Sequence, residues 1–326
     1  MLDFLPTLFD FAPGVLGIVA AIATAVLWKN LEHEQRCWAV FGVMALVLTW
    51  AFMNSFDKVF EAWKSPQYSH GYLIPVFTLA LLYLKRQPFD KVVPTWQQGL
   101  GLGIIVVAVL IRHYFGLRAI FTPDRLMYIP ALIGAMMIIG GLNALKWSAL
   151  PLLFLGFAYP LPTSLERGFL QPMKTLSTRV SHYALETLGI ECFTEGNRIM
   201  LDGMELGVVD ACSGLRMFTI FLALAGGIAL VSKRPLWERI IIFFPFSILI
   251  SLAVNSIRIT LTGLAYALMG NKGEMVSVIN TVFHDFAGWI MMPIALGLLA
   301  LVYHGLKRVI IEDEEKKLAP IGAAVQ

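Results

Sequence analysis

Charged residues are scarce in this chain, and their scarcity excludes an ordinary soluble protein. Asp, Glu, Lys and Arg make up 14% of the 326 residues, 58% are hydrophobic, and the mean hydropathy is +0.73. Soluble domains are typically about 45–50% apolar, so the composition predicts an integral membrane protein. The net charge of +3 is carried mostly by loops. It therefore bears on membrane topology and does not indicate a nucleic-acid-binding surface.

Cysteine is also rare, which argues against a zinc site. The chain has three cysteines, and a zinc site needs three or four ligands in a recognisable array. Cys37 lies far from the other two in sequence and supplies no such array. We expect neither a metal nor another cofactor.

A secretory signal is missing as well, because Asp3 and Asp10 stand where a basic segment would belong. We therefore expect the first span to be retained. A bilayer-spanning helix needs roughly 20 mostly apolar residues. On this criterion we expect an all-α, polytopic bundle of about eight or nine transmembrane helices, forming a single membrane domain over residues 1–326. The expected spans cover 11–28, 37–53, 71–84, 97–112, 126–145, 148–161, 212–231, 240–268 and 284–304.

Lysine and arginine gather in four short loops, at 29–36, 85–91, 233–239 and 307–308. Such loops tend to stay in the cytoplasm. This topology places the N-terminus outside, the tail 307–326 inside and the long segment 162–211 outside.

The outward segment 162–211 predicts a small extramembrane part. Residues 165–189 carry an apolar face opposite polar residues, which is typical of a helix lying on the membrane surface. That face comprises Leu176, Val180, Tyr183 and Leu188. Farther on, two short apolar runs flank Asp202-Gly203, a strong signal for a β-hairpin.

A polar group at the start of the span 212–231 is the first candidate for chemistry. Asp210 is a plausible N-cap for a helix beginning at residue 211. Cys212 would then lie in the first turn, where the helix dipole favours the thiolate. Arg216 follows one turn later on the same face. The alternative is that Cys212 is a small buried residue and Asp210 only a cap.

The span 240–268 carries a polar stripe made of Ser251, Asn255, Arg258 and Thr262, spaced three or four residues apart. A stripe on an otherwise apolar helix must face protein or water. Counted from Ile240, Arg258 lies about 27 Å along the helix and hence near the outer membrane boundary. The alternative is an arginine that snorkels to the headgroups, but such an arginine needs no amide on its own face.

His284 begins the last expected span at the same outer level. A lone histidine at a membrane boundary is more often structural, but this one shares its depth with Cys212 and Arg258. A histidine can activate a thiol for nucleophilic catalysis, and a fixed cation can stabilise the resulting oxyanion. The set therefore predicts an acyl-transfer site. Cys192 could pair with Cys212, but a disulfide would block the nucleophile, so we interpret Cys192 as a bystander.

These motifs resemble the exosortase/archaeosortase family of membrane transpeptidases. The resemblance rests on "ACSGLR" at 211–216, "NSIR" at 255–258, His284 and "QYSHGYLIP" at 67–75, and it covers residues of about 60–300. It implies that Cys212, Arg258 and His284 form the catalytic set. It also implies an enzyme of a bacterial or archaeal plasma membrane, with its active site on the extracytoplasmic side.

The resemblance further implies partners: membrane-anchored proteins with a C-terminal motif, a transmembrane helix and a basic cluster, met among the membrane lipids. The tail would be cut through a cysteine thioester and the protein passed to an acceptor. Tyr68, Ser69 and His70 are expected to support the substrate entrance, the alternative being a helix start capped by Ser69. The competing function is a transporter or lipid-handling protein that binds an anionic substrate with buried Arg and His.

Overall fold

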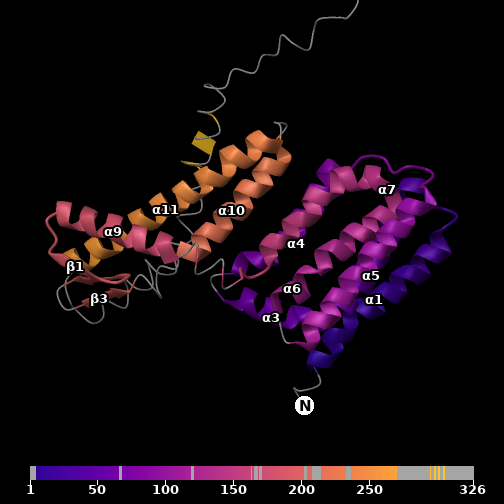
Figure 1. The fold of residues 1–326 in the computed structure, drawn as a ribbon, viewed down its shortest axis with the longest axis horizontal. Helices are drawn as coiled ribbons and strands as arrows, with labels where there is room; N and C mark the ends of the chain where they lie inside the picture. Colours follow the sequence, from indigo (N-terminus) through magenta and orange to yellow (C-terminus); the bar gives the residue numbers. More distant parts are fainter. Residues whose placement is uncertain are drawn as a thin grey trace, which may run out of the picture. The chain divides into compact units, whose positions relative to one another are not determined.

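The computed structural model of the chain is mostly helical (Figure 1). It describes residues 5–65, 68–118, 121–162, 171–201, 204–207, 214–232 and 236–269, with isolated positions at 164, 168 and between 294 and 304. The chain divides into two compact units. Unit 1 comprises Met1–Pro172 and Leu222–Ile241, and unit 2 comprises Met173–Phe221 and Ile242–Gln326.

Unit 1 is a helical bundle in which α7 packs against several neighbours, and α4, α5 and α7 lie side by side in Figure 1. The pair of α5 and α7 meets at Gly101 and Gly134, where a Cβ on either would come within 2.7 Å of the other's carbonyl oxygen. Small residues allow such close packing in membranes. The helices described between residues 5 and 158 are α1 (Leu5–Leu27), α2 (His33–Ala51), α3 (Met53–Lys64), α4 (Ile74–Lys85), α5 (Thr95–Leu117), α6 (Phe121–Leu126) and α7 (Tyr128–Phe154), with 3-10 turns η1 (Ser69–Tyr72) and η2 (Leu155–Ala158).

The predicted break between spans 126–145 and 148–161 is misplaced. Helix α7 runs through residues 146–147 and breaks instead at Gly141, which has a positive φ of 63°. Lys146 lies within the expected break, where its side chain is exposed and donates a hydrogen bond to Asn143 Oδ1 at 3.2 Å. A lysine can extend its side chain away from the helix to a polar environment, so its presence does not require the helix to end.

The described residues include three helical stretches long and apolar enough to cross a membrane: Thr95–Leu117, Pro123–Ala158 and Pro245–Leu268. A fourth arises if α2 and α3, bent by 83°, form one broken span. Shorter apolar helices at Ala12–Leu27, Ile74–Lys85 and Phe218–Val231 coincide with further expected spans. The total of eight or nine stays a prediction, since most of 284–304 lies outside the described residues.

Unit 2 contains α9 (Gln171–Thr187) and a three-stranded antiparallel sheet in the order β1-β2-β3. The strands are β1 (Cys192–Glu195), β2 (Arg198–Leu201) and β3 (Met204–Gly207). Leu201 pairs with Met204, which confirms the predicted hairpin around 202–203. The sequence analysis missed β1, so the predicted hairpin is part of a three-stranded sheet within a mostly helical chain. Strand β1 joins β2 through a two-residue turn at Gly196, whose φ is 63°.

Helices α10 (Gly214–Val231) and α11 (Leu236–Met269) follow the sheet. Ile259 of α11 forms a buried apolar cluster with Leu185 of α9 and with Ile199 and Leu201 of β2. Helix α9 and the sheet thus build a small hydrophobic core around the C-terminal third of α11.

Candidate active site

The polar stripe of α11 faces the protein interior. Asn255 is 3% exposed and Arg258 is 4% exposed, and Ser251 is buried as well. The apolar residues Leu249, Ile257 and Leu261 of the same helix are exposed instead. This confirms the prediction that the stripe turns away from lipid. A snorkelling arginine would reach the surface, so that alternative is wrong for Arg258.

Contacts from α9 hold the segment of α11 around Arg258. Ser181 Oγ donates a hydrogen bond to the Ser256 carbonyl oxygen at 3.0 Å. One turn beyond Arg258, a Cβ on Gly263 would lie 2.9 Å from Leu185 Cδ1, so the glycine lets α9 approach closely. Arg258 is therefore carried on a stretch of helix fixed on both sides along the chain.

The polar atoms of the stripe differ in how they are satisfied. Thr262 Oγ1 donates to the Arg258 carbonyl oxygen at 2.8 Å, and Ser251 Oγ donates to the Ile248 carbonyl oxygen at 2.9 Å. Asn255 Oδ1 is buried and has no hydrogen-bond partner among the described residues. Buried polar atoms are nearly always paired, so Asn255 marks a point where a further polar group belongs.

The other residues of the expected site are placed only in part. Asp210, Cys212 and His284 lie outside the described residues, and Arg216 is described only as a backbone position in the first turn of α10. Within the described ranges, no group of three or more His, Cys, Asp and Glu side chains is arranged to hold a metal ion.

The Tyr-Ser-His-Gly motif lies in unit 1, where Ser69–Tyr72 forms η1 and Tyr68 occupies its cap position. A Cβ on Gly71 would overlap the indole of Trp63, so only glycine fits there. Trp63 Nε1 donates to the Ala158 carbonyl oxygen at 2.6 Å. Tyr68, which is buried, accepts a hydrogen bond at its hydroxyl from the Leu161 backbone N–H at 3.3 Å.

This geometry makes the motif a clasp on the chain at 158–161, through the contacts of Trp63 and Tyr68. Ser69 is the first residue of η1 and Tyr68 occupies the cap position without a capping side-chain bond. The alternative in which Ser69 caps a helix is therefore wrong. The rings of Tyr68 and His70 lie 6.3 Å apart, and His70 is half-buried.

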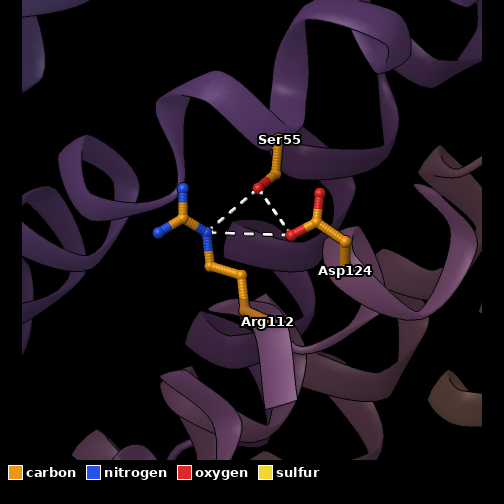
Figure 2. Close-up of polar contacts among 3 residues, drawn as sticks. All are labelled: Ser55, Arg112 and Asp124. Atoms are coloured by element: carbon orange, nitrogen blue, oxygen red, sulfur yellow. Dashed lines mark hydrogen bonds and ion pairs between the residues drawn. The ribbon is translucent and has the colours of Figure 1, made fainter. Parts of the chain in front are cut away.

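A polar cluster in unit 1 was missed by the sequence analysis (Figure 2). Ser55 Oγ donates to Asp124 Oδ1 at 2.9 Å, and Arg112 Nε donates to Ser55 Oγ at 3.0 Å. Arg112 Nε also lies 3.8 Å from Asp124 Oδ1. The signal available in the sequence was Arg112 itself, because a charge at the end of an apolar span requires a partner.

Comparison with protein families places much of the chain in a known family. The model of the transmembrane exosortase family (Exosortase_EpsH) matches residues 62–301. The chain belongs to this family. Exosortases are cysteine transpeptidases, so this protein is an enzyme and the transporter alternative is wrong. Comparisons with curated proteins and with solved structures gave no match.

The matched region of this exosortase includes the η1 motif, the α11 stripe and positions 212 and 284, whereas α1, α2 and Ser55 precede it. Cys192 is a free thiol on β1. Burial, and then the nearby carboxylate of Glu186, raise the pKa of Cys192 above its ordinary value. A thiol that resists deprotonation is a poor nucleophile, which fits the role of a bystander.

Proposed function

We propose that this exosortase cleaves the C-terminal sorting tail of exported, membrane-anchored proteins through a thioester on Cys212. The Cys212 thiolate attacks the scissile carbonyl carbon, and Arg258 stabilises the oxyanion that forms. His284 protonates the departing amine as the peptide bond breaks, leaving a thioester. An acceptor then loses its proton to His284, attacks the thioester carbonyl and releases the Cys212 thiolate.

The observation that carries this proposal is the burial of Arg258 beside Asn255 on α11. A fixed cation acts on a developing charge far more strongly inside a protein than in water. Asn255 Oδ1, which has no hydrogen-bond partner among the described residues, offers a second polar contact on the same helix face. An arginine with a purely structural role would have little need of a second buried polar side chain, such as Asn255, on its own face of the helix.

The depth of Arg258 supports a site at the extracytoplasmic boundary. Helix α11 has 34 residues, or about 51 Å, against a hydrocarbon core of about 30 Å. Part of α11 must therefore project into water. The α9–sheet core surrounds its C-terminal third, from about Ser256 onward. The basic loops assign this end to the outside by the positive-inside rule.

A site at this depth suits a substrate that is itself anchored in the membrane. The family implies substrates of the PEP-CTERM type, whose sorting tails end in a membrane segment. Confinement to the membrane raises the effective concentration of such a tail at the site. A soluble peptide would have to reach a catalytic site that lies partly within the membrane boundary.

The decisive experiment is to trap the thioester. The purified enzyme is incubated with a tailed substrate, quenched in acid and analysed by intact-mass and peptide mass spectrometry. We expect a substrate adduct on Cys212 that neutral hydroxylamine releases. Cys192→Ala is the matched control and should keep the adduct. An adduct that persists in Cys212→Ala would contradict the proposal.

The membrane side is tested separately by labelling. In a cysteine-free variant, Asn271→Cys should react with a membrane-impermeant maleimide added from outside. Arg86→Cys, in a basic loop, is the control and should react only after the membrane is opened. The reverse pattern would overturn the assigned topology, whatever the catalytic roles prove to be.

A further inference from the structure

Helix α9 exposes its apolar face and buries its polar one. Leu176 is 47% exposed, Val180 45% and Tyr183 73%, while Ser177 and Ser181 are buried. A helix at the surface of a soluble domain has the opposite arrangement, with its apolar stripe on the core. The exposed stripe therefore requires a partner other than water.

The contacts with α11 prevent α9 from turning this stripe inward. Ser181, on the opposite face, donates its hydroxyl to the Ser256 carbonyl oxygen at 3.0 Å. Leu185 is fully buried in the cluster with Ile259 and packs against Gly263. Rotating α9 would break the hydrogen bond and empty the cluster.

Charged side chains flank the stripe on one side only. At 100° per residue, Arg179 and Glu186 lie on the edge next to Tyr183, on the far side of the stripe from Val180, and both are exposed. His182 lies farther along that edge, 3.5 Å from Glu186 Oε1 and 3.1 Å from the Cys192 carbonyl oxygen. An apolar stripe with a charged edge is the pattern of a helix in the membrane–water interface.

The level of α9 along α11 agrees with that position. The hydrogen bond from Ser181 reaches Ser256, which lies within the candidate span Pro245–Leu268. Beside it on α11, Ile257 and Leu261 are exposed apolar residues, as expected where lipid begins to cover the helix. At the same level but on the opposite face of α11, Ile259 enters the core that α9 and β2 form.

We infer that α9 is an interfacial helix whose Leu176, Val180 and Tyr183 insert between phospholipids, and that it thereby sets the depth of Arg258 relative to the membrane surface. The occupant of the exposed stripe is the boundary between headgroups and acyl chains. The inferred lipid contact depends only on the observations made on α9. The importance of the depth of Arg258 rests on the proposed function.

The lipid contact is tested by fluorescence quenching in nanodiscs. Full-length protein without native cysteines receives a single Val180→Cys or Glu186→Cys change and an environment-sensitive dye. We expect the dye at 180 to be quenched by phospholipids carrying a nitroxide on the upper acyl chain and shielded from iodide. The dye at 186 should show the reverse. Equal iodide quenching at both positions would overturn the inference.

Two further outcomes of this experiment are decisive. The dye at position 180 could be shielded from both nitroxide and iodide, and only when two chains share a nanodisc. That result would show that a second copy of the chain covers the stripe, and it would reject the lipid contact. Should the cysteine-free chain fail to fold, a benzoylphenylalanine photoprobe at position 183 of the native chain replaces the dye. Crosslinks to phospholipid support the inference, and crosslinks confined to protein or water contradict it.

The depth-setting part has its own readout, which needs no catalysis. A dye at Ile257→Cys, next to Arg258 and exposed, reports the depth of this segment through nitroxides at two positions on the acyl chain. Adding Val180→Asp should shift the ratio of shallow to deep quenching, and Val180→Leu should restore the native ratio. An unchanged ratio in Val180→Asp would show that α9 does not set the depth. Because neither dye experiment measures turnover, both can succeed or fail independently of the catalytic roles.

Discussion

Ser55 donates a hydrogen bond to Asp124 at 2.9 Å, and both side chains are buried although 69 residues separate them in the chain. Arg112 completes the cluster through Nε, and Figure 2 shows its two terminal nitrogens turned away from the carboxylate. The ring of Phe52 lies 5.0 Å from the guanidinium carbon. The cluster thus joins α3, α5 and α6 through one carboxylate oxygen and one hydroxyl.

Asp124→Asn should destabilise unit 1, although the new side chain has nearly the same size and shape as the old one. The substitution removes the charge that faces Arg112 and weakens the acceptor of the Ser55 hydroxyl. A hydrogen bond to a charged group contributes about 1.5–3 kcal/mol, and Arg112 is partly exposed, so we expect a loss near the lower value. The apparent melting temperature in detergent should fall by several degrees. Glu61→Gln, at an exposed position of α3, should leave it nearly unchanged, and equal losses would contradict a role for the cluster.

Gly71→Ala should disrupt the clasp formed by the Tyr-Ser-His-Gly motif. The added methyl group would overlap the Trp63 indole and displace it from the Ala158 carbonyl oxygen. Overpacking of a buried site typically costs about 1–3 kcal/mol. We expect a lower melting temperature together with faster proteolysis of the segment after residue 158.

Gly103→Ala is the matched control for this prediction. Gly103 lies in helix α5, and a Cβ added there would have no atom within 4 Å. Alanine is a better helix former than glycine by about 1 kcal/mol, so this variant should melt at the same temperature or slightly higher. A similar loss in both variants would show that the Trp63 contact is not the cause.

Local sequence patterns predicted the elements that are determined locally. The spacing of Asn255 and Arg258 placed both on one helix face, and their burial follows because lipid cannot satisfy them. Asp202-Gly203 predicted the β2–β3 hairpin because few other residues suit a two-residue turn. Gly196-Asn197 is a turn signal of the same kind, and it could have revealed β1.

Features that depend on distant residues could not be read from the sequence. Nothing near Asp124 indicates that its partner is Ser55, since 69 residues of chain separate the two. The apolar face of α9 was predicted, but not that its small polar residues would pack on α11, as Ser181 does. The break at Gly141 was missed because glycine alone is compatible with a continuous membrane helix.

Arg258→Lys should nearly abolish turnover. Lysine keeps the positive charge but lacks the planar guanidinium of arginine. The several N–H donors of that group can bind an oxyanion and a second polar group at the same time. Loss of one oxyanion donor typically lowers kcat about 100–1000-fold, and we expect a loss in that range with normal membrane insertion. Arg198→Lys, an exposed arginine of β2, should keep its activity. Full turnover in Arg258→Lys would show that Arg258 acts only as a bulk charge.

Cys192 should alkylate slowly, and its rate should depend steeply on pH. Burial, and then the charge of Glu186, raise the pKa of Cys192 above that of an ordinary cysteine, so less thiolate exists at pH 8 and the rate should keep rising at a pH where that of a free cysteine peptide has levelled off. Glu186→Gln removes the negative charge, lowers the pKa and should increase the rate at pH 8. The rate is measured with iodoacetamide in a chain whose other cysteines are serine. Alkylation faster than that of a free cysteine peptide at pH 8 would identify Cys192 as an activated thiol and reopen its role.

The substrate should be selected by the depth of its scissile bond. If Arg258 and Cys212 act at the outer boundary, only a bond held just outside the bilayer can reach them. The transmembrane helix of the tail holds the bond at that level, and basic residues behind the helix keep it in register. Inserting about 10 flexible residues between motif and helix moves the bond by up to roughly 30 Å. Cleavage at the motif should then fall at least tenfold, because the bond samples a volume of water in place of one fixed depth.

The control for this prediction carries the same insert on the other side of the motif. There the distance between the bond and the membrane stays the same, so cleavage should remain close to that of the unmodified substrate. Both substrates are compared by product formation over time in the same nanodisc preparation. If the displaced motif were cut as fast as the control, the enzyme would recognise the motif at any height, and the proposed position of Arg258 at the boundary would have no part in choosing the bond.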